Sequence, residues 1–197
     1  MSRELTLITG GVRTGKSAFA MKLAERSGGS VLFLATMAPG DDEDRRRVRR
    51  HQEARPSHWQ TVEEPLAVPE ALGRWGPGFE TVVLDCLTLW VARIMESECA
   101  PKSPAGDLPS SEADRVEEAV ERRVSDLLAA YAGQSCSLIV VSNEVGAGLV
   151  PVYPSGRLFR DLLGLANQRL AAQADTVHYL VAGLPLTLKG RDAGDRV

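Results

Sequence analysis

Hydrophobic residues along the chain form short apolar runs that alternate with segments in which they recur every three or four residues. Short apolar runs that end at glycine or polar residues are typical of buried strands. We expect strands at residues 5–9, 31–36, 60–62, 81–84, 137–142 and 176–181. Helical spacing predicts helices at residues 16–26, 68–75, 87–96, 111–132 and 158–174. The alternation predicts an α/β fold with five or more largely parallel strands and helices on both faces of the sheet.

Three segments stand outside this alternation, and we expect none of them to separate two domains. Residues 41–53 are dense in charge, which is typical of an exposed helix or arm. Residues 97–111 are rich in Ser, Pro and Gly and indicate a surface loop. Residues 190–197 are expected to form a frayed tail. The length of 197 residues fits a single domain over residues 1–197.

Composition narrows the class of protein. Hydrophobic residues make up 44% and charged residues 25% of the chain, the balance of an ordinary globular domain. The net charge of −3 argues against general attraction to nucleic acid or anionic membranes. No apolar stretch approaches the roughly 20 residues that span a bilayer, so we expect a cytoplasmic protein.

The cysteines, Cys86, Cys99 and Cys136, are odd in number and widely spaced. This pattern argues against a disulfide framework and against a structural zinc site. Cys86 and Cys136 lie in or beside apolar runs, so we expect both to be buried in the core.

The segment Gly10–Ser17 reads GGVRTGKS and matches the phosphate-binding loop (P-loop) pattern G-x-x-x-x-G-K-[ST] in full. Glycines allow the backbone to curl so that successive N–H groups point at phosphate oxygens, and the following helix adds its N-terminal dipole. Lys16 would place a charge between the β- and γ-phosphates, and the Ser17 hydroxyl would bind Mg²⁺. Because the motif follows a predicted strand and opens a predicted helix, we expect it to bind ATP or GTP.

A carboxylate at the end of a neighbouring strand is the usual partner of such a loop. Asp85 directly follows the apolar run 81–84. This is the position of a Walker B acid, which helps to hold Mg²⁺. The alternative is an ordinary aspartate in the turn at a strand end. We favour the metal role, with Ser17 and Asp85 as ligands.

Arginine is concentrated in the segment RRRVRRH, residues 45–51. The simplest interpretation is a solvated charged face, balanced by acidic residues just upstream. A nucleic-acid patch is a weaker alternative, since no aromatic residues interleave the run. A third hypothesis gives His51 a chemical role. Clustered arginines disfavour the imidazolium and attract a triphosphate, so a neutral His51 could form a covalent phosphoramidate with a nucleotide.

Motifs spread over nearly the whole chain, from Leu5 to about Lys189, are similar to those of one enzyme family. They are GGVRTGKS at 10–17, FLAT at 33–36, HQEARPSHW at 51–59, TVE at 61–63, VVLDCLT at 82–88, VSNEVGAGLVP at 141–151 and FRDLLGLANQRLA at 159–171. The phosphate loop is shared by many families, whereas the histidine segment together with NEVG and NQRLA is far more specific. By these motifs the chain resembles the bifunctional adenosylcobinamide kinase / adenosylcobinamide-phosphate guanylyltransferases of cobalamin biosynthesis.

The resemblance implies two transferase reactions. The first, a kinase reaction, moves a phosphoryl group from ATP or GTP to the hydroxyl of adenosylcobinamide. The second, a nucleotidyltransferase reaction, moves GMP from GTP to the resulting phosphate and gives adenosyl-GDP-cobinamide. The resemblance also implies that His51 carries the GMP as a covalent intermediate, that the fold is RecA-like, and that the protein forms homotrimers.

By the same resemblance, a set of residues is expected to contact the nucleotide, and the loop pattern adds Ser17. The set is Thr9, Gly10, Gly11, Val12, Arg13, Thr14, Gly15, Lys16, Leu34, Ala35, Thr36, Gln52, Glu53, Ala54, Arg55, Glu63 and Asp85. Two positions depart from the family pattern: Thr14 stands where the family often has Ser, and Asp85 stands where some members have Glu.

Two other functions stay open on the sequence. A P-loop regulatory or assembly ATPase or GTPase would use Lys16 without covalent chemistry at His51. A nucleic-acid binder would use the basic segment, although the net charge of −3 counts against it. Our leading hypothesis is the bifunctional transferase, with a corrinoid substrate and further copies of the chain as partners and with no nucleic acid and no membrane span.

Overall fold

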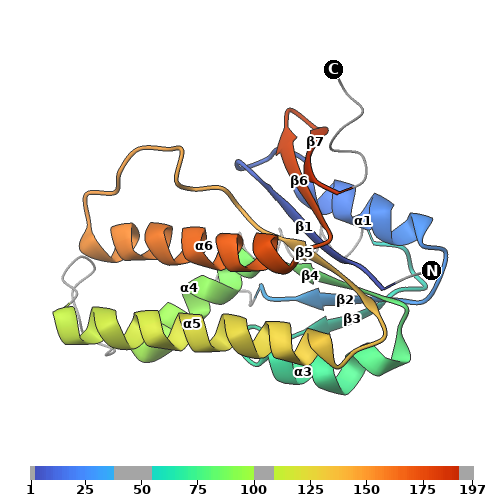
Figure 1. Cartoon of the computed structure of the whole chain (residues 1–197), viewed down its shortest axis with the longest axis horizontal. Coiled ribbons are helices and arrows are strands. Elements are labelled where there is room, and N and C mark those ends of the chain that lie inside the picture. Colours follow the sequence, from blue (N-terminus) through green and yellow to red (C-terminus); the bar gives the residue numbers. More distant parts are fainter. Residues whose placement is uncertain (1–2, 38–54, 100–108, 191–197) are drawn as a thin grey trace.

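The computed structural model describes residues 3–37, 55–99 and 109–190, which form a seven-stranded sheet between layers of helices (Figure 1). The strands are β1 (Leu5–Gly10), β2 (Val31–Ala35), β3 (Gln60–Glu63), β4 (Thr81–Asp85), β5 (Ser137–Val141), β6 (Thr176–Val181) and β7 (Leu184–Lys189). Their order across the sheet is β3-β2-β4-β5-β1-β6-β7. All neighbouring strands pair in parallel except β6 and β7. The expected α/β fold with a mostly parallel sheet is therefore confirmed.

The helices divide unequally between the two faces of the sheet. Helix α1 (Lys16–Arg26) packs on one face. The other face carries α3 (Val68–Trp75), which a short 3-10 turn follows at Gly76–Gly78, together with α4 (Leu87–Glu98), α5 (Ser110–Ala132) and α6 (Pro154–Gln173). Figure 1 shows these four helices to the left of and below the strands, and α1 to their upper right.

Alternate residues of the central strands feed two hydrophobic clusters. Leu7 and Val140 face the four-helix side, whereas Ile8 and Val141 face α1. Because successive side chains of a strand point to opposite faces, a strand covered on both sides must be apolar at every position. This explains why β1, β4 and β5 appear in the sequence as continuous apolar runs.

Strand β7 was not predicted. It follows β6 through a two-residue turn at Ala182 and Gly183, whose φ angles of 51° and 83° are both positive. Turns of this kind match the twist of a hairpin. Leu184, Leu186 and Leu188 are exposed and alternate with less exposed residues. That alternation was a readable strand signal, and Pro185 is compatible with the edge position that β7 takes.

The other helix and strand boundaries lie closer to those predicted from the sequence. Helix α6 begins at Pro154, one turn before the expected residue 158, because proline suits the first turn of a helix. Helix α4 continues to Glu98. The charged segment 41–53 lies outside the described residues, as do 100–108 of the expected surface loop and 191–197 of the expected tail.

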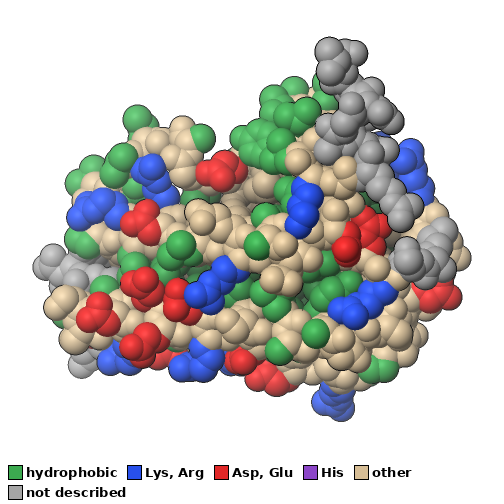
Figure 2. Space-filling model, in the orientation of Figure 1, with side chains coloured by type: hydrophobic (Ala, Val, Ile, Leu, Met, Phe, Trp, Pro, Cys, Tyr) green, Lys and Arg blue, Asp and Glu red, His purple; other side chains and the backbone are tan. Residues whose placement is uncertain are grey.

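The carboxyl ends of the parallel strands meet at one edge of the sheet, which is where ligands of such sheets bind. Figure 2 shows hydrophobic side chains on the segment before α6 and on the β6–β7 hairpin, with a hollow between them. The most exposed are Leu149, Val152 and Leu184, at 97%, 84% and 72% of full exposure.

Candidate functional site

The phosphate loop forms the turn between β1 and α1, as the sequence predicts. Gly10 has a φ of 145°, and a Cβ on it would lie 2.5 Å from the carbonyl oxygen of Leu180. Gly15, the last residue before α1, has a φ of 91°. Both positions therefore require glycine. The loop is held on its other side by the Gly183 N–H, which donates to the Thr14 carbonyl at 3.1 Å.

Lys16 lies inside the loop and is only 7% exposed. Its Nζ donates to the Gly11 carbonyl at 2.5 Å. Burial lowers the pKa of Lys16, while the neighbouring Cys86 and Asp85 act in the opposite direction. The ammonium is therefore held inside the loop. It is bonded to the Gly11 carbonyl, and a phosphate oxygen of a nucleotide could take the place of that carbonyl as its partner.

The start of α1 leaves its backbone donors available. No side chain caps the helix at Gly15, and the first turn contains no acidic residue. The first N–H groups of a helix have no partner within the helix and favour an anion. Ser17 is half-buried in this first turn, beside Lys16. The local geometry therefore suits a phosphate group, as the motif predicts.

Asp85 ends β4, and one strand, β5, separates it from β1. The turn after Asp85 is fixed by Thr36, which is fully buried at the end of β2. The Thr36 hydroxyl accepts a hydrogen bond from the Cys86 N–H and donates one to the Cys86 carbonyl, both at 2.8 Å. The Thr36 N–H also donates to the Asp85 carbonyl at 3.1 Å. Thr36 thus holds the ends of β2 and β4 together.

Cys86 is half-buried rather than buried, whereas Cys136 is buried as expected, and all three cysteines are free. Burial raises the pKa of the Cys86 thiol to about 11, and the negative charge of Asp85 acts in the same direction. The thiol is therefore neutral near pH 7 and unsuited to act as a nucleophile.

Arg55 is near two other residues that were predicted to contact the nucleotide, Asp85 and Glu63. Its guanidinium carbon lies 3.8 Å from the centre of the Phe33 ring, and its NH1 donates to the Thr61 hydroxyl at 3.3 Å. Burial lowers the pKa of Arg55, while Asp85 and Glu63 act in the opposite direction. Both carboxylates are therefore close enough to stabilise the guanidinium. Its Nε is buried without a hydrogen-bond partner among the described residues.

The remaining residues predicted to contact the nucleotide are partly in the core, partly exposed and partly outside the described residues. Leu34 is 1% exposed, its side chain packs in the core under the four helices, and its backbone is paired between β3 and β4. Ala35 packs on the α1 side, and Val12 and Arg13 are exposed in the loop. The histidine segment lies outside the described residues, and with it His51, Gln52, Glu53 and Ala54.

A second group of polar residues at this edge was missed by sequence reasoning. Asn143 N–H donates to the Thr88 hydroxyl at 2.8 Å, and Asn167 Nδ2 donates to the Asn143 carbonyl at 3.0 Å. Glu144 N–H donates to the Gly10 carbonyl at 3.0 Å. These bonds join α4, α6 and the segment after β5 to the start of the phosphate loop. The signal was the motifs VVLDCLT, NEVG and NQRLA, which contain four of these residues.

Three buried polar atoms near this group have no hydrogen-bond partner among the described residues. They are Thr9 Oγ1, Ser142 Oγ and Asn167 Oδ1. Because Ile8 pairs with Val141, Thr9 and Ser142 lie side by side at the ends of β1 and β5. Buried polar atoms in folded proteins are nearly always paired, so these mark a place for water or for a polar ligand.

The described residues contain no group of three His, Cys, Asp or Glu side chains that could hold a metal ion. Mg²⁺ does not need one, since it commonly takes one or two protein oxygens and completes its shell with water and phosphate. Ser17, next to Lys16 in α1, and Asp85, at the end of β4, carry oxygens of the right kind. Across 3–37, 55–99 and 109–190, no helix is long and apolar enough to cross a membrane.

The chain is similar to proteins of one biosynthetic family over nearly its whole length. The family described as cobinamide kinase / cobinamide phosphate guanyltransferase matches residues 6–188. The bifunctional adenosylcobalamin biosynthesis protein CobP of Pseudomonas aeruginosa is 36% identical over 184 residues, which cover 93% of this chain and 96% of that protein. The bifunctional adenosylcobalamin biosynthesis protein CobU of Escherichia coli is 35% identical over 185 residues, covering 94% of this chain and 99% of that protein.

Among solved structures, the RadB recombinase is 14% identical, with a TM-score of 0.46 over 89% of this chain and 73% of that chain. The match to the family covers the phosphate loop, the Asp85 turn and the segments that carry Asn143 and Asn167. The chain therefore belongs to the cobinamide kinase / cobinamide phosphate guanyltransferase family.

Proposed function

We propose that this protein phosphorylates adenosylcobinamide with ATP or GTP and then transfers GMP from GTP to adenosylcobinamide phosphate, giving adenosyl-GDP-cobinamide for cobalamin biosynthesis. The observation that carries this proposal is the phosphate loop, in which a buried Lys16 lies close to Asp85 at the ligand-binding edge of the sheet. Family membership and the names of the bifunctional relatives support both activities.

We propose that the nucleotide contacts a set of residues around this edge, with Ser17 and Asp85 also holding Mg²⁺. The set is Thr9, Gly10, Gly11, Val12, Arg13, Thr14, Gly15, Lys16, Ser17, Leu34, Ala35, Thr36, Gln52, Glu53, Ala54, Arg55, Glu63 and Asp85. When bound, Mg²⁺ would neutralise charge on the β- and γ-phosphates. Lys16 and the first N–H groups of α1 would orient the phosphates for transfer.

Guanylyl transfer would proceed through His51. A ring nitrogen of His51 attacks the α-phosphorus of GTP, the bond to the bridging oxygen breaks, and pyrophosphate leaves with the electron pair. A phosphate oxygen of adenosylcobinamide phosphate then attacks the same phosphorus, and the histidine nitrogen leaves. Arg55, which follows this segment and lies beside Asp85 and Glu63, would help to stabilise the negative charge on the phosphates.

The organisation of the protein is part of the same proposal. We infer that residues 1–197 act as one domain, since all described strands belong to a single sheet. By family resemblance we propose a homotrimer, and the exposed leucines of β7 offer apolar surface that such an assembly could cover. A cytoplasmic location would give the enzyme access to nucleoside triphosphates.

The test of the covalent mechanism is incubation with α-³²P-GTP followed by mass spectrometry of the peptide that contains His51. We expect acid-labile label and one added GMP on this peptide, and none in His51→Ala. His58→Ala is the matched control, because His58 is an exposed histidine of the same segment and should not affect labelling. A wild-type protein that never takes label, or a labelled His51→Ala protein, would rule out the guanylyl-histidine.

The kinase activity is tested separately, with γ-³²P-ATP and adenosylcobinamide. We expect label in the corrinoid product and a requirement for Lys16. Steady hydrolysis that needs Lys16 but gives no labelled corrinoid would instead support a regulatory P-loop ATPase.

A further inference from the structure

Glu144 lies beside the phosphate loop, at the edge of the sheet where the strands end. It follows β5, the strand between β1 and the strand that ends at Asp85. Its N–H is bonded to the carbonyl of Gly10, the first residue of the phosphate loop, at 3.0 Å. Glu144 is half-buried, so it is partly accessible to solvent. The backbone of Glu144 is thus tied directly to the phosphate site.

The two oxygens of the Glu144 carboxylate are not equivalent. The Gly146 N–H donates to Oε1 at 2.5 Å and orients the side chain. For Oε2, the described part of the chain offers no hydrogen-bond or ion-pair partner. One oxygen therefore fixes the group and the other is available to a ligand.

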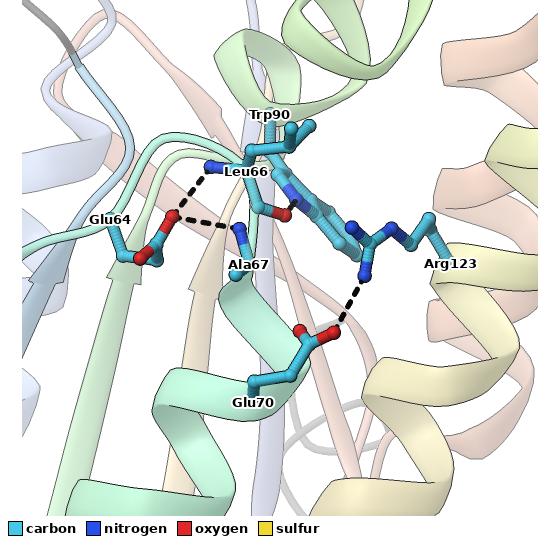
Figure 3. Close-up of polar contacts among 6 residues, drawn as sticks. All are labelled: Glu64, Leu66, Ala67, Glu70, Trp90 and Arg123. Atoms are coloured by element: carbon cyan, nitrogen blue, oxygen red, sulfur yellow. Dashed lines mark hydrogen bonds and ion pairs between the residues drawn. The ribbon is translucent and has the colours of Figure 1, made fainter. Parts of the chain in front are cut away.

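Glu64 makes similar local bonds, which Figure 3 shows, and serves as a comparison for Glu144. Glu64 Oε1 accepts hydrogen bonds from the N–H groups of Leu66 at 3.0 Å and Ala67 at 2.7 Å, just before α3 begins. It therefore satisfies donors at a helix start, which is a structural role. No helix follows Glu144 until Pro154. Shaping the turn into α3 explains the bonds of Glu64, and no helix starts directly after Glu144.

The other carboxylates at this edge have different surroundings. Asp85 lies beside Lys16 and Arg55 and is suited to the metal. Glu63 lies on the outermost strand, β3, also beside Arg55. Glu144 follows the strand that pairs directly with β1. Among the described residues it is the carboxylate whose backbone is bonded to the phosphate loop.

The chain around Glu144 is held firmly. Asn143 is bonded through its N–H to Thr88 of α4 and through its carbonyl to Asn167 of α6. On the other side, Ser142 is fully buried with a hydroxyl that has no partner in the described residues. A proton-transfer group must be positioned by its neighbours to work well. The segment thus combines a fixed carboxylate with unmet hydrogen-bonding capacity for a polar ligand or water.

We infer that Glu144 is the general base of phosphoryl transfer to the corrinoid, an inference that rests on the proposed kinase activity. The acceptor oxygen attacks the γ-phosphorus as its proton passes to Glu144 Oε2. The bond from the γ-phosphorus to the bridging oxygen breaks, and the nucleoside diphosphate leaves with that electron pair. Glu144 then releases the proton to water.

The test compares Glu144→Gln with wild-type protein in both reactions. Glutamine keeps the oxygen that accepts from Gly146 N–H but cannot take a proton. We expect kcat for phosphorylation of adenosylcobinamide to fall by about 10²- to 10⁴-fold, with little change in KM for the nucleotide. Labelling of His51 by α-³²P-GTP should stay at the wild-type level, because that step does not use the acceptor hydroxyl.

Two further variants separate a chemical role from a structural one. Glu144→Ala should be equally slow, and added formate should partly restore its kcat by supplying a carboxylate. Glu64→Gln is the matched control and should keep the wild-type kcat, since it retains the oxygen that accepts from Leu66 and Ala67.

A Glu144→Gln protein with wild-type kcat, or one that loses histidine labelling to the same extent, would overturn the inference. So would a Glu144→Ala protein that formate does not improve. If wild-type protein transfers no phosphoryl group to the corrinoid, the proposed kinase function itself fails, which is a different result.

Discussion

At the scale of single residues, sterics and local charge limit what the site accepts. Lys16 is almost fully buried, and its Nζ is held by the Gly11 carbonyl. Burial alone would favour the neutral amine, but Asp85 and the phosphates of a bound nucleotide favour the ammonium. Gly10 is limited by space instead, because the backbone of β6 lies against it. The loop therefore needs these residue types for separate physical reasons.

Gly10→Ala should destabilise the protein. Its φ of 145° is strained for any side chain, and the new Cβ would lie 2.5 Å from the Leu180 carbonyl oxygen. We expect the free energy of unfolding in urea to fall by at least about 1–3 kcal/mol. Gly164→Ala is the control, since a Cβ there meets nothing within 4 Å and Gly164 lies inside α6. That variant should gain about 0.5–1 kcal/mol. Equal midpoints for the two variants would contradict this account.

At the scale of elements, the site is assembled from the ends of strands that other residues hold in place. Thr36 joins the end of β2 to the turn after β4 through two side-chain hydrogen bonds. Asn143 and Asn167 join the segment after β5 to α6 in the same manner. These polar bonds lie at the ends of the apolar runs and join the strand ends to one another and to α6.

Thr36→Val should weaken this joint while keeping the shape of the side chain. It would leave the N–H and carbonyl of Cys86 without their partner, and each unmet buried group costs about 1–3 kcal/mol. We expect a lower urea midpoint and slower turnover, because Asp85 is no longer fixed. Thr6→Val is the control, because Thr6 is also a buried threonine but lies near the start of β1. If both variants unfold at the same midpoint, the Thr36 bonds do not contribute as described.

At the scale of the whole molecule, the strand order places β1 in the sheet interior and leaves β3 and β7 at its edges. The interior strands carry the phosphate loop, Asp85 and the Glu144 segment. The β7 edge instead exposes Leu184, Leu186 and Leu188. Exposed apolar surface of this kind is often covered by another protein surface. The first of these leucines, Leu184, follows Gly183, whose N–H is bonded to the phosphate loop, so the proposed assembly surface begins beside the proposed nucleotide site.

The proposed homotrimer predicts a particle of about three times the 21.2 kDa mass of one chain. Sedimentation equilibrium over a range of concentrations measures this directly. The same protein in guanidinium serves as the monomer control. A single species at the mass of one chain at micromolar concentration would contradict the trimer.

Much of the fold was predictable because its signals are local. The helix at residues 16–26 was predicted to the residue, since glycines bound it and its apolar spacing is regular. The strand β7 was missed because its leucines face solvent and Pro185 interrupts a strand pattern. The predicted start of α6, residue 158, was one turn too late. Proline is common in loops as well as in the first turn of a helix, so Pro154 alone did not indicate a helix start. For the site, the loop motif predicted the phosphate-binding residues. Glu144 and Asn167 lie in motifs that indicated the family but not a chemical role, so they were not predicted as site residues.

The sequence by itself determined the phosphate loop, the alternation of strands and helices, and the family resemblance. Each of these depends on residues that are neighbours in the chain, so spacing and residue type are sufficient. Only the tertiary structure decided that Arg55 lies beside both Asp85 and Glu63, and that Glu144 is bonded to Gly10. Such contacts depend on the order and register of strands, which bring distant residues to one edge of the sheet. No local pattern encodes that order.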